Sequence, residues 1–78
     1  MLEFELIENN DKFVSYRYFP DGKTDSGTVV VSKSNSSVIK EDIAESDEFK
    51  TYFFHMLNQI KTFIKNNKYK EKGIIAWY

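Results

Sequence analysis

The chain has 78 residues and a net charge of −1, and it contains one His and no Cys. A chain of this length forms one domain and buries only about 60–65 % of the surface that its unfolded form exposes. Natural domains of this size usually gain stability from disulfides, a metal or a partner subunit. Disulfides and thiolate metal sites need Cys, and one His without neighbouring ligands does not form a zinc site. We therefore expect no cofactor and no metal. Of the usual means of stabilising a small domain, a partner subunit remains.

The charges are unevenly divided along the chain. Residues 1–48 carry eleven acidic and five basic side chains, a net charge of −6, whereas residues 49–78 carry six Lys and one Glu, a net charge of +5. This asymmetry predicts either an anionic partner for the basic half or an attraction between the two halves, within one molecule or across a dimer.

The amino terminus and the hydropathy favour a cytoplasmic location. The opening "MLEFELIENN" has acidic residues where a signal peptide needs positive charge, and no long apolar stretch follows it. No run approaches the ~18 apolar residues of a membrane span. The frequent use of Lys, Asn and Ile is typical of AT-rich bacterial genomes. We therefore expect a soluble, cytoplasmic bacterial protein with no membrane partner.

Alternation of apolar and polar side chains predicts two strands, over residues 2–8 and 13–19. The "NND" between them is typical of a short hairpin loop, because Asn and Asp tolerate left-handed backbone. In the second strand the alternation places Val14, Tyr16 and Tyr18 on one face and Phe13, Arg17 and Phe19 on the opposite face. A three-residue loop gives these cross-strand pairs: Leu6 with Val14, Phe4 with Tyr16, Leu2 with Tyr18, and Glu3 with Arg17 on the opposite face.

Two further strands are predicted over residues 28–33 and 38–43. The segment "PDGKTDSG" before the first of them holds the only Pro and two of the three Gly, so it marks a turn. "TVVVSK" is β-branched and typical of a strand, and "SNSS" turns the chain again. "VIKEDIA" alternates less clearly, so its end can also begin a helical turn.

A long amphipathic helix is predicted over residues 47–66. Ser46 or Asp47 is a suitable N-cap. The helix dipole favours negative charge in the first turn, where Asp47 and Glu48 are expected. Lys65 and the lysines that follow suit the dipole at the other end. The apolar residues recur at helical spacing and form one face: Phe49, Tyr52, Phe53, Met56, Leu57, Ile60, Phe63 and Ile64. The fold class is therefore α+β, a three- or four-stranded antiparallel meander with this helix packed on one face.

The carboxyl-terminal segment, residues 73–78, reads "GIIAWY" and ends on two aromatic residues, Trp77 and Tyr78. Burial of an aromatic side chain is a large contribution to a small core, so we expect the segment to return against the sheet or helix as an extra strand. The alternative is an exposed tail that a partner, or a second copy of the chain, captures by strand addition.

Phe54 lies outside the apolar face of the predicted helix, between Lys50, Lys61 and Lys65. An aromatic side chain surrounded by lysines can anchor a protein interface, or it can stack on a nucleobase while the ammonium groups bind phosphates. The third possibility is a wider apolar face, with Phe54 packed against the carboxyl-terminal segment.

No motif in the chain points to catalysis. His55 has neither a Cys nor an Asp at helical spacing that could act with it in catalysis. The segment "DGKTDSG" fails the EF-hand calcium pattern at its third and twelfth positions. The chain also lacks a Gly-rich phosphate loop and a nucleophile elbow. We therefore expect that it is not an enzyme.

The acidic hairpin, "GTVVVSK", the aromatic helix and the terminal "KGIIAWY" together resemble short uncharacterised proteins of low-GC Gram-positive bacteria and their phages. The resemblance covers nearly the whole chain and rests chiefly on "GIIAWY"; it implies no activity, cofactor or site residue. The order of meander and helix is also similar to single-strand-binding folds of the transcriptional-coactivator type, as an analogy of topology.

Two functions are consistent with these patterns. The first is a non-enzymatic protein-interaction module that self-associates through the open sheet face or the edge near the tail. The alternative is a weak single-stranded nucleic-acid binder that uses the lysines around Phe54 and also Lys68.

Overall fold

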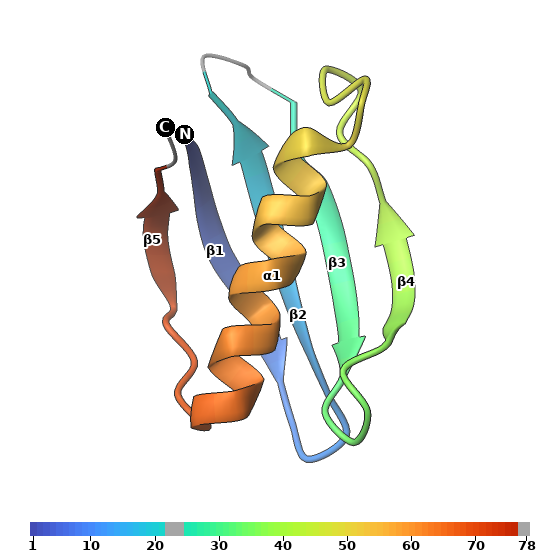
Figure 1. Cartoon of the computed structure of the whole chain (residues 1–78), viewed down its shortest axis with the longest axis vertical. Coiled ribbons are helices and arrows are strands. Elements are labelled where there is room, and N and C mark those ends of the chain that lie inside the picture. The colour runs from blue at the N-terminus through green and yellow to red at the C-terminus, as the bar shows by residue number, and fades with distance from the viewer. Residues whose placement is uncertain (22–24, 77–78) are drawn as a thin grey trace.

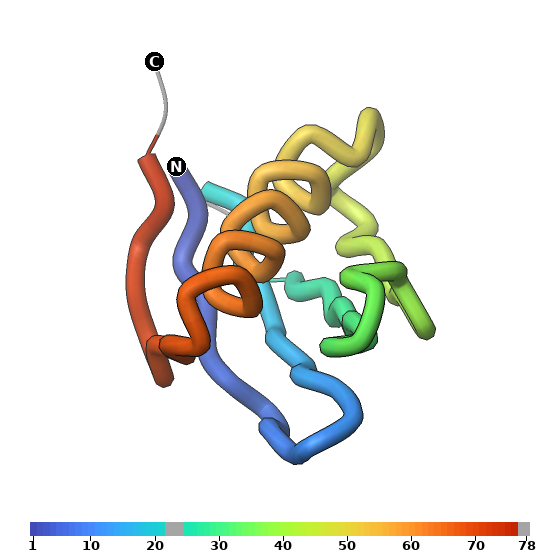
Figure 2. The backbone as a smooth tube through the Cα atoms, turned by 60° about the horizontal axis from the view of Figure 1, so that its bottom comes forward, coloured from blue at the N-terminus to red at the C-terminus, as the bar shows by residue number. Residues whose placement is uncertain are grey.

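The computed structural model describes residues 1–21 and 25–76. A five-stranded antiparallel sheet in the order β4-β3-β2-β1-β5 carries one helix of 16 residues on one face, which confirms the α+β class and adds a strand to the predicted number (Figure 1). The sheet curves around the helix (Figure 2). The elements are β1 (Leu2–Asn9), β2 (Phe13–Pro20), β3 (Gly27–Ser32), β4 (Val38–Asp42), α1 (Thr51–Asn66) and β5 (Lys72–Ile75).

The β1–β2 hairpin has a different register from the predicted one. Glu5, not Glu3, lies opposite Arg17, and the pairs of Leu2 to Leu6 are shifted by two residues from the predicted ones. The loop is shorter because the Asn10 side-chain oxygen accepts hydrogen bonds from the backbone N–H groups of the two residues at its far end, at 2.8 and 3.0 Å. A bulge at Ile7 absorbs the extra residue on β1. A shift of two keeps each side chain on its expected face.

The hydrophobic core lies between the sheet and α1. Three aromatic rings form its centre: Phe4 lies 5.6 Å from Tyr16, and Phe63 of α1 lies 5.9 and 5.6 Å from these two rings. The buried apolar side chains come from β1, β2, β3, the segment after β4, and α1: Leu2, Phe4, Val14, Tyr16, Tyr18, Val29, Val31, Ala44, Phe53, Met56, Leu57, Ile60 and Phe63.

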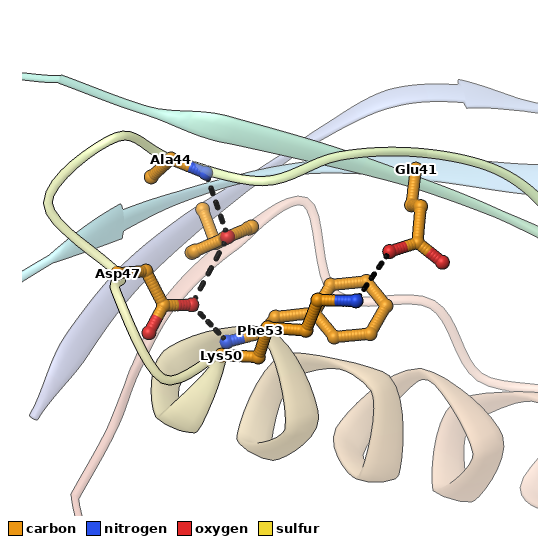
Figure 3. Close-up of polar contacts among 6 residues, drawn as sticks. Glu41, Ala44, Asp47, Lys50 and Phe53 are labelled. Carbon is orange, nitrogen blue, oxygen red and sulfur yellow. Dashed lines mark hydrogen bonds and ion pairs between the residues drawn. The ribbon is translucent and has the colours of Figure 1, made fainter.

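Helix α1 begins four residues later than predicted. Lys50 adopts a left-handed conformation with φ of 58°, and the chain before it forms turns, so the first helical residue is Thr51. Phe49 therefore lies outside the helix with 81 % of its surface exposed, and its predicted place on the apolar face is wrong. The Asp47 carboxylate still caps the helix, because it accepts the N–H groups of Tyr52 and Phe53 at 3.1 and 2.8 Å (Figure 3).

The carboxyl-terminal segment returns to the sheet as β5, which pairs antiparallel with β1 and forms one edge (Figure 1). Gly73 lies opposite Phe4, and a Cβ at this position would come within 2.7 Å of the Phe4 ring. The ring thus covers the position where β5 has no side chain, an arrangement that stabilises glycine in sheets. The extra strand is confirmed over Lys72–Ile75, whereas Trp77 and Tyr78 lie outside the described residues.

Candidate interaction surfaces

Four of the predicted site residues lie on or beside α1, and their surroundings differ. Phe54 is 52 % exposed, and its ring makes an edge contact with Phe53 at 5.3 Å. Lys61 and Lys65 are exposed on the same helix. The Lys50 ammonium lies 3.4 Å from the Glu41 carboxylate of β4, so its charge is directed toward the sheet (Figure 3).

Sequence reasoning missed Phe49 as a second exposed aromatic residue near the start of α1, because helical spacing placed it on the buried face. The signal that could have found it is the polar segment "ESDE" directly before it. That segment favours turns as readily as a first helical turn.

Tyr18 and Asp47 form a buried polar node, a set of hydrogen-bonded atoms that joins β2 to the start of α1. Tyr18 donates a hydrogen bond to Asp47 at 3.2 Å, and its oxygen accepts the N–H of Ala44 at 3.0 Å. Asp47 is only 3 % exposed. Burial raises the pKa of Tyr18 to about 12; the Ala44 hydrogen bond lowers it, and the nearby Asp47 charge raises it. Because each of these atoms bonds within the protein, the node holds the helix and does not face a ligand.

A second buried hydroxyl ties the sheet to the segment after α1. Tyr16 donates a hydrogen bond to the carbonyl oxygen of Lys70 at 2.7 Å, and burial raises its pKa above the usual range. Beside this contact lies a hollow of about 460 Å³ lined by Phe63, Lys68 and Tyr69 among others. Lys68, the fourth lysine of the nucleic-acid hypothesis, therefore borders this hollow at the carboxyl end of the helix.

The face of the sheet opposite α1, called the open face below, combines charged and apolar side chains. Directly paired residues share a face in an antiparallel sheet, so the register defines its members. One row crosses all five strands: Asp42, Thr28, Arg17, Glu5 and Lys72. Within it, Arg17 and Glu5 form an ion pair at 2.9 Å, with 42 % and 36 % of their side chains exposed.

The apolar side chains of the open face flank this row of charges. Phe13, Phe19 and Val30 are partly buried, and Ile74 of β5 is 60 % exposed. The predicted placement of Phe13, Arg17 and Phe19 on this face agrees with the register. A hollow of about 360 Å³ lies where β1 meets β5; its walls include Glu3, Phe19 and Ile74.

Comparisons with family models, curated proteins and solved structures found no match to this chain. Among residues 1–21 and 25–76, no helix is long and apolar enough to cross a membrane. Within the same residues, no three potential ligands among His, Cys, Asp and Glu are placed to hold a metal ion.

Proposed function

We propose that this protein is a small non-enzymatic interaction module that associates with a second copy of itself through the open face or through the β5 edge beside it. The observation that carries the proposal is the open face, on which Phe19 and Ile74 line one hollow, and Phe13 lies beyond the charged row, without a covering helix. An uncovered patch of apolar side chains rimmed by polar groups is typical of a protein–protein contact.

The charges of the open face suit a self-complementary contact. The row through Arg17 carries both signs, with Asp42 and Lys72 at its two ends. A surface of mixed sign can place each charge against an opposite one in a symmetric dimer, whereas a surface of one sign repels its own copy. A partner subunit is also the stabiliser that a 78-residue chain without Cys still has available.

The molar mass in solution tests this proposal. Size-exclusion chromatography with light scattering, run from micromolar to millimolar concentration, should show the mass rising from 9.2 kDa toward twice that value. A constant mass of 9.2 kDa over the whole range would contradict self-association. Exchange of Phe19 for Ser removes apolar area from the open face without touching the covered core, so it should weaken an association through that face and leave an association through the β5 edge unchanged.

The alternative function is weak binding of single-stranded nucleic acid along the exposed side of α1. The exposure of Phe54, together with Lys61 and Lys65 on the same helix, favours it. The pairing of Lys50 with Glu41 and the acidic residues of β1 weigh against it.

Fluorescence anisotropy with a labelled oligothymidine at low salt separates the two functions. A nucleic-acid binder should lose affinity in Phe54→Ala and on addition of salt, whereas Phe49→Ala, at an exposed aromatic residue that precedes the helix, should bind normally. Absence of binding at low salt would rule out this alternative.

A further inference from the structure

The backbone of β5 has donors and acceptors directed away from the sheet. The N–H of Leu6 bonds to the carbonyl oxygen of Glu71 at 2.7 Å, so Glu71 turns its polar groups toward β1. Hydrogen bonding alternates along an antiparallel strand, so the polar groups of Lys72 and Ile74 point to the outer edge, and extension of the strand by one residue adds those of Ala76. No described segment pairs with that edge, because β5 is the last strand of the sheet.

The two edges of the sheet differ in how they discourage further pairing. Edge strand β4 has a bulge at Ile39 and three charged residues, Lys40, Glu41 and Asp42, features that natural sheets use to block addition of another strand. Over residues 72–76, β5 has one charged side chain and a regular register with β1. The β5 edge is therefore the one open to another strand.

We propose that β5 pairs antiparallel with β5 of a second copy, about a two-fold axis that passes through Ile74. This pairing rests on the self-association proposed above and places the contact at the β5 edge, so that the open faces of the two copies lie side by side. The axis is perpendicular to the sheet, because symmetric antiparallel pairing requires it, so both copies of α1 lie on the same side of one ten-stranded sheet. Ile74 meets its own copy, and Lys72 pairs with Ala76 of the second copy, which gives about six new backbone hydrogen bonds.

Other registers are less favourable. With Lys72 on the axis, two like charges lie directly opposite each other, which is destabilising. With Gly73 on the axis, two glycines face each other and the two Lys72 side chains become diagonal neighbours. With Ile75 on the axis, the paired stretch within residues 72–76 becomes shorter.

The Ile74 register also fits the shape of the helix-facing side. It places Ile75 of one copy opposite Gly73 of the other, beside the Phe4 ring that covers this glycine. The side chain of Ile75 thus lies next to the Phe4 ring and extends the core of Phe4 and Leu2 across the interface. On the other side, the two Ile74 side chains, each 60 % exposed in one molecule, cover each other and join the two open faces.

A pair of matched substitutions tests the geometry. Ile74 and Ile39 are the exposed isoleucines of the two edge strands, 60 % and 58 % exposed, so Lys at either position has a similar effect on the single molecule. Ile74→Lys places two ammonium groups at the axis and should raise the dimer dissociation constant at least tenfold. Ile39→Lys should leave the constant unchanged.

Disulfide formation gives a second measurement that does not depend on losing the dimer. The chain has no Cys, so Ile74→Cys introduces one thiol per copy, and residues that share a hydrogen-bonded antiparallel pair lie within the Cα range of a disulfide. Mild oxidation, in which two thiols lose two hydrogens to the oxidant, should link Ile74→Cys as a dimer far faster than Ile39→Cys. A dimer that persists in Ile74→Lys and does not cross-link through position 74 overturns the β5 pairing while leaving self-association intact. A chain that stays monomeric at millimolar concentration overturns both.

Discussion

The two faces of this sheet come from one alternating sequence and differ in what they contribute. On the face under α1, neighbours such as Tyr16 and Val29 have no exposed surface, and their aromatic and aliphatic contacts form the core. On the open face, residues between them, such as Arg17 and Val30, are only partly buried. One helix can cover only one face, so the covered face stabilises the fold while the open face of the single molecule stays in contact with solvent.

The largest expected difference between the faces is the cost of losing apolar volume. Ile60 of α1 has no exposed surface, so Ile60→Ala should lower the free energy of unfolding by about 2–5 kcal/mol. For a domain of marginal stability this loss brings the chain close to unfolding. Ile74→Ala, at a residue 60 % exposed on the open face, should change it by less than about 0.5 kcal/mol. Urea unfolding at low protein concentration measures both; equal losses would show that the faces do not differ as described.

The second expected effect concerns the buried polar node that fastens α1 to the covered face. Asp47→Ala removes the acceptor for the Tyr18 hydroxyl and for two N–H groups of the first helical turn. The substitution should therefore lower the free energy of unfolding by about 2 kcal/mol. Exposed Glu48 is the matched acidic control, and Glu48→Ala should have little effect. Circular dichroism during urea unfolding gives both values. If the two variants were equally stable, the cap would not hold the helix.

A smaller, pH-dependent effect arises from the same face. The pKa of Tyr18 rises from 10.0 to about 12 on folding, chiefly through burial. As pH rises, the Tyr18 hydroxyl therefore loses its proton in the unfolded chain before it does so in the folded one. Its contribution to the free energy of unfolding is complete below about pH 10 and is lost as pH rises toward about 12. The loss is at most about 1.4 kcal/mol per pH unit for each such hydroxyl. Urea midpoints above pH 9 should fall less steeply in Tyr18→Phe. Identical slopes would contradict the assigned shift.

Much of the architecture could be predicted from the sequence because the patterns that determine it are local. Alternation identified which side chains of β1 and β2 share a face, and helical spacing identified the buried stripe of α1. Both patterns depend only on the period of the element. The members of the open face that lie on β2, Phe13, Arg17 and Phe19, were predictable for the same reason.

Features that depend on competing local contacts, or on closure of the whole chain, could not be predicted in this way. The hairpin register depends on a turn formed by the Asn10 side chain and on the bulge at Ile7, and the start of α1 depends on the left-handed backbone of Lys50. Residue types alone do not decide the hairpin register or the first residue of the helix. The position of Gly73 beside Phe4, and with it the shape of the β5 edge, exists only once β5 has paired with β1.

The smallest expected effect belongs to the ion pair of the open face. Arg17 and Glu5 lie 2.9 Å apart, but about two fifths of each side chain is exposed, so water and salt screen their attraction. A double-mutant cycle of Arg17→Ala and Glu5→Ala should give a coupling of about 0.2–1 kcal/mol at low salt that shrinks as salt is added. A coupling energy above this range that does not change with salt would mean that water does not reach the Arg17–Glu5 pair. That outcome requires another molecule to cover the open face. Repeating the cycle at a protein concentration where the dimer forms therefore shows whether the partner covers this pair or, as β5 pairing predicts, leaves it facing solvent.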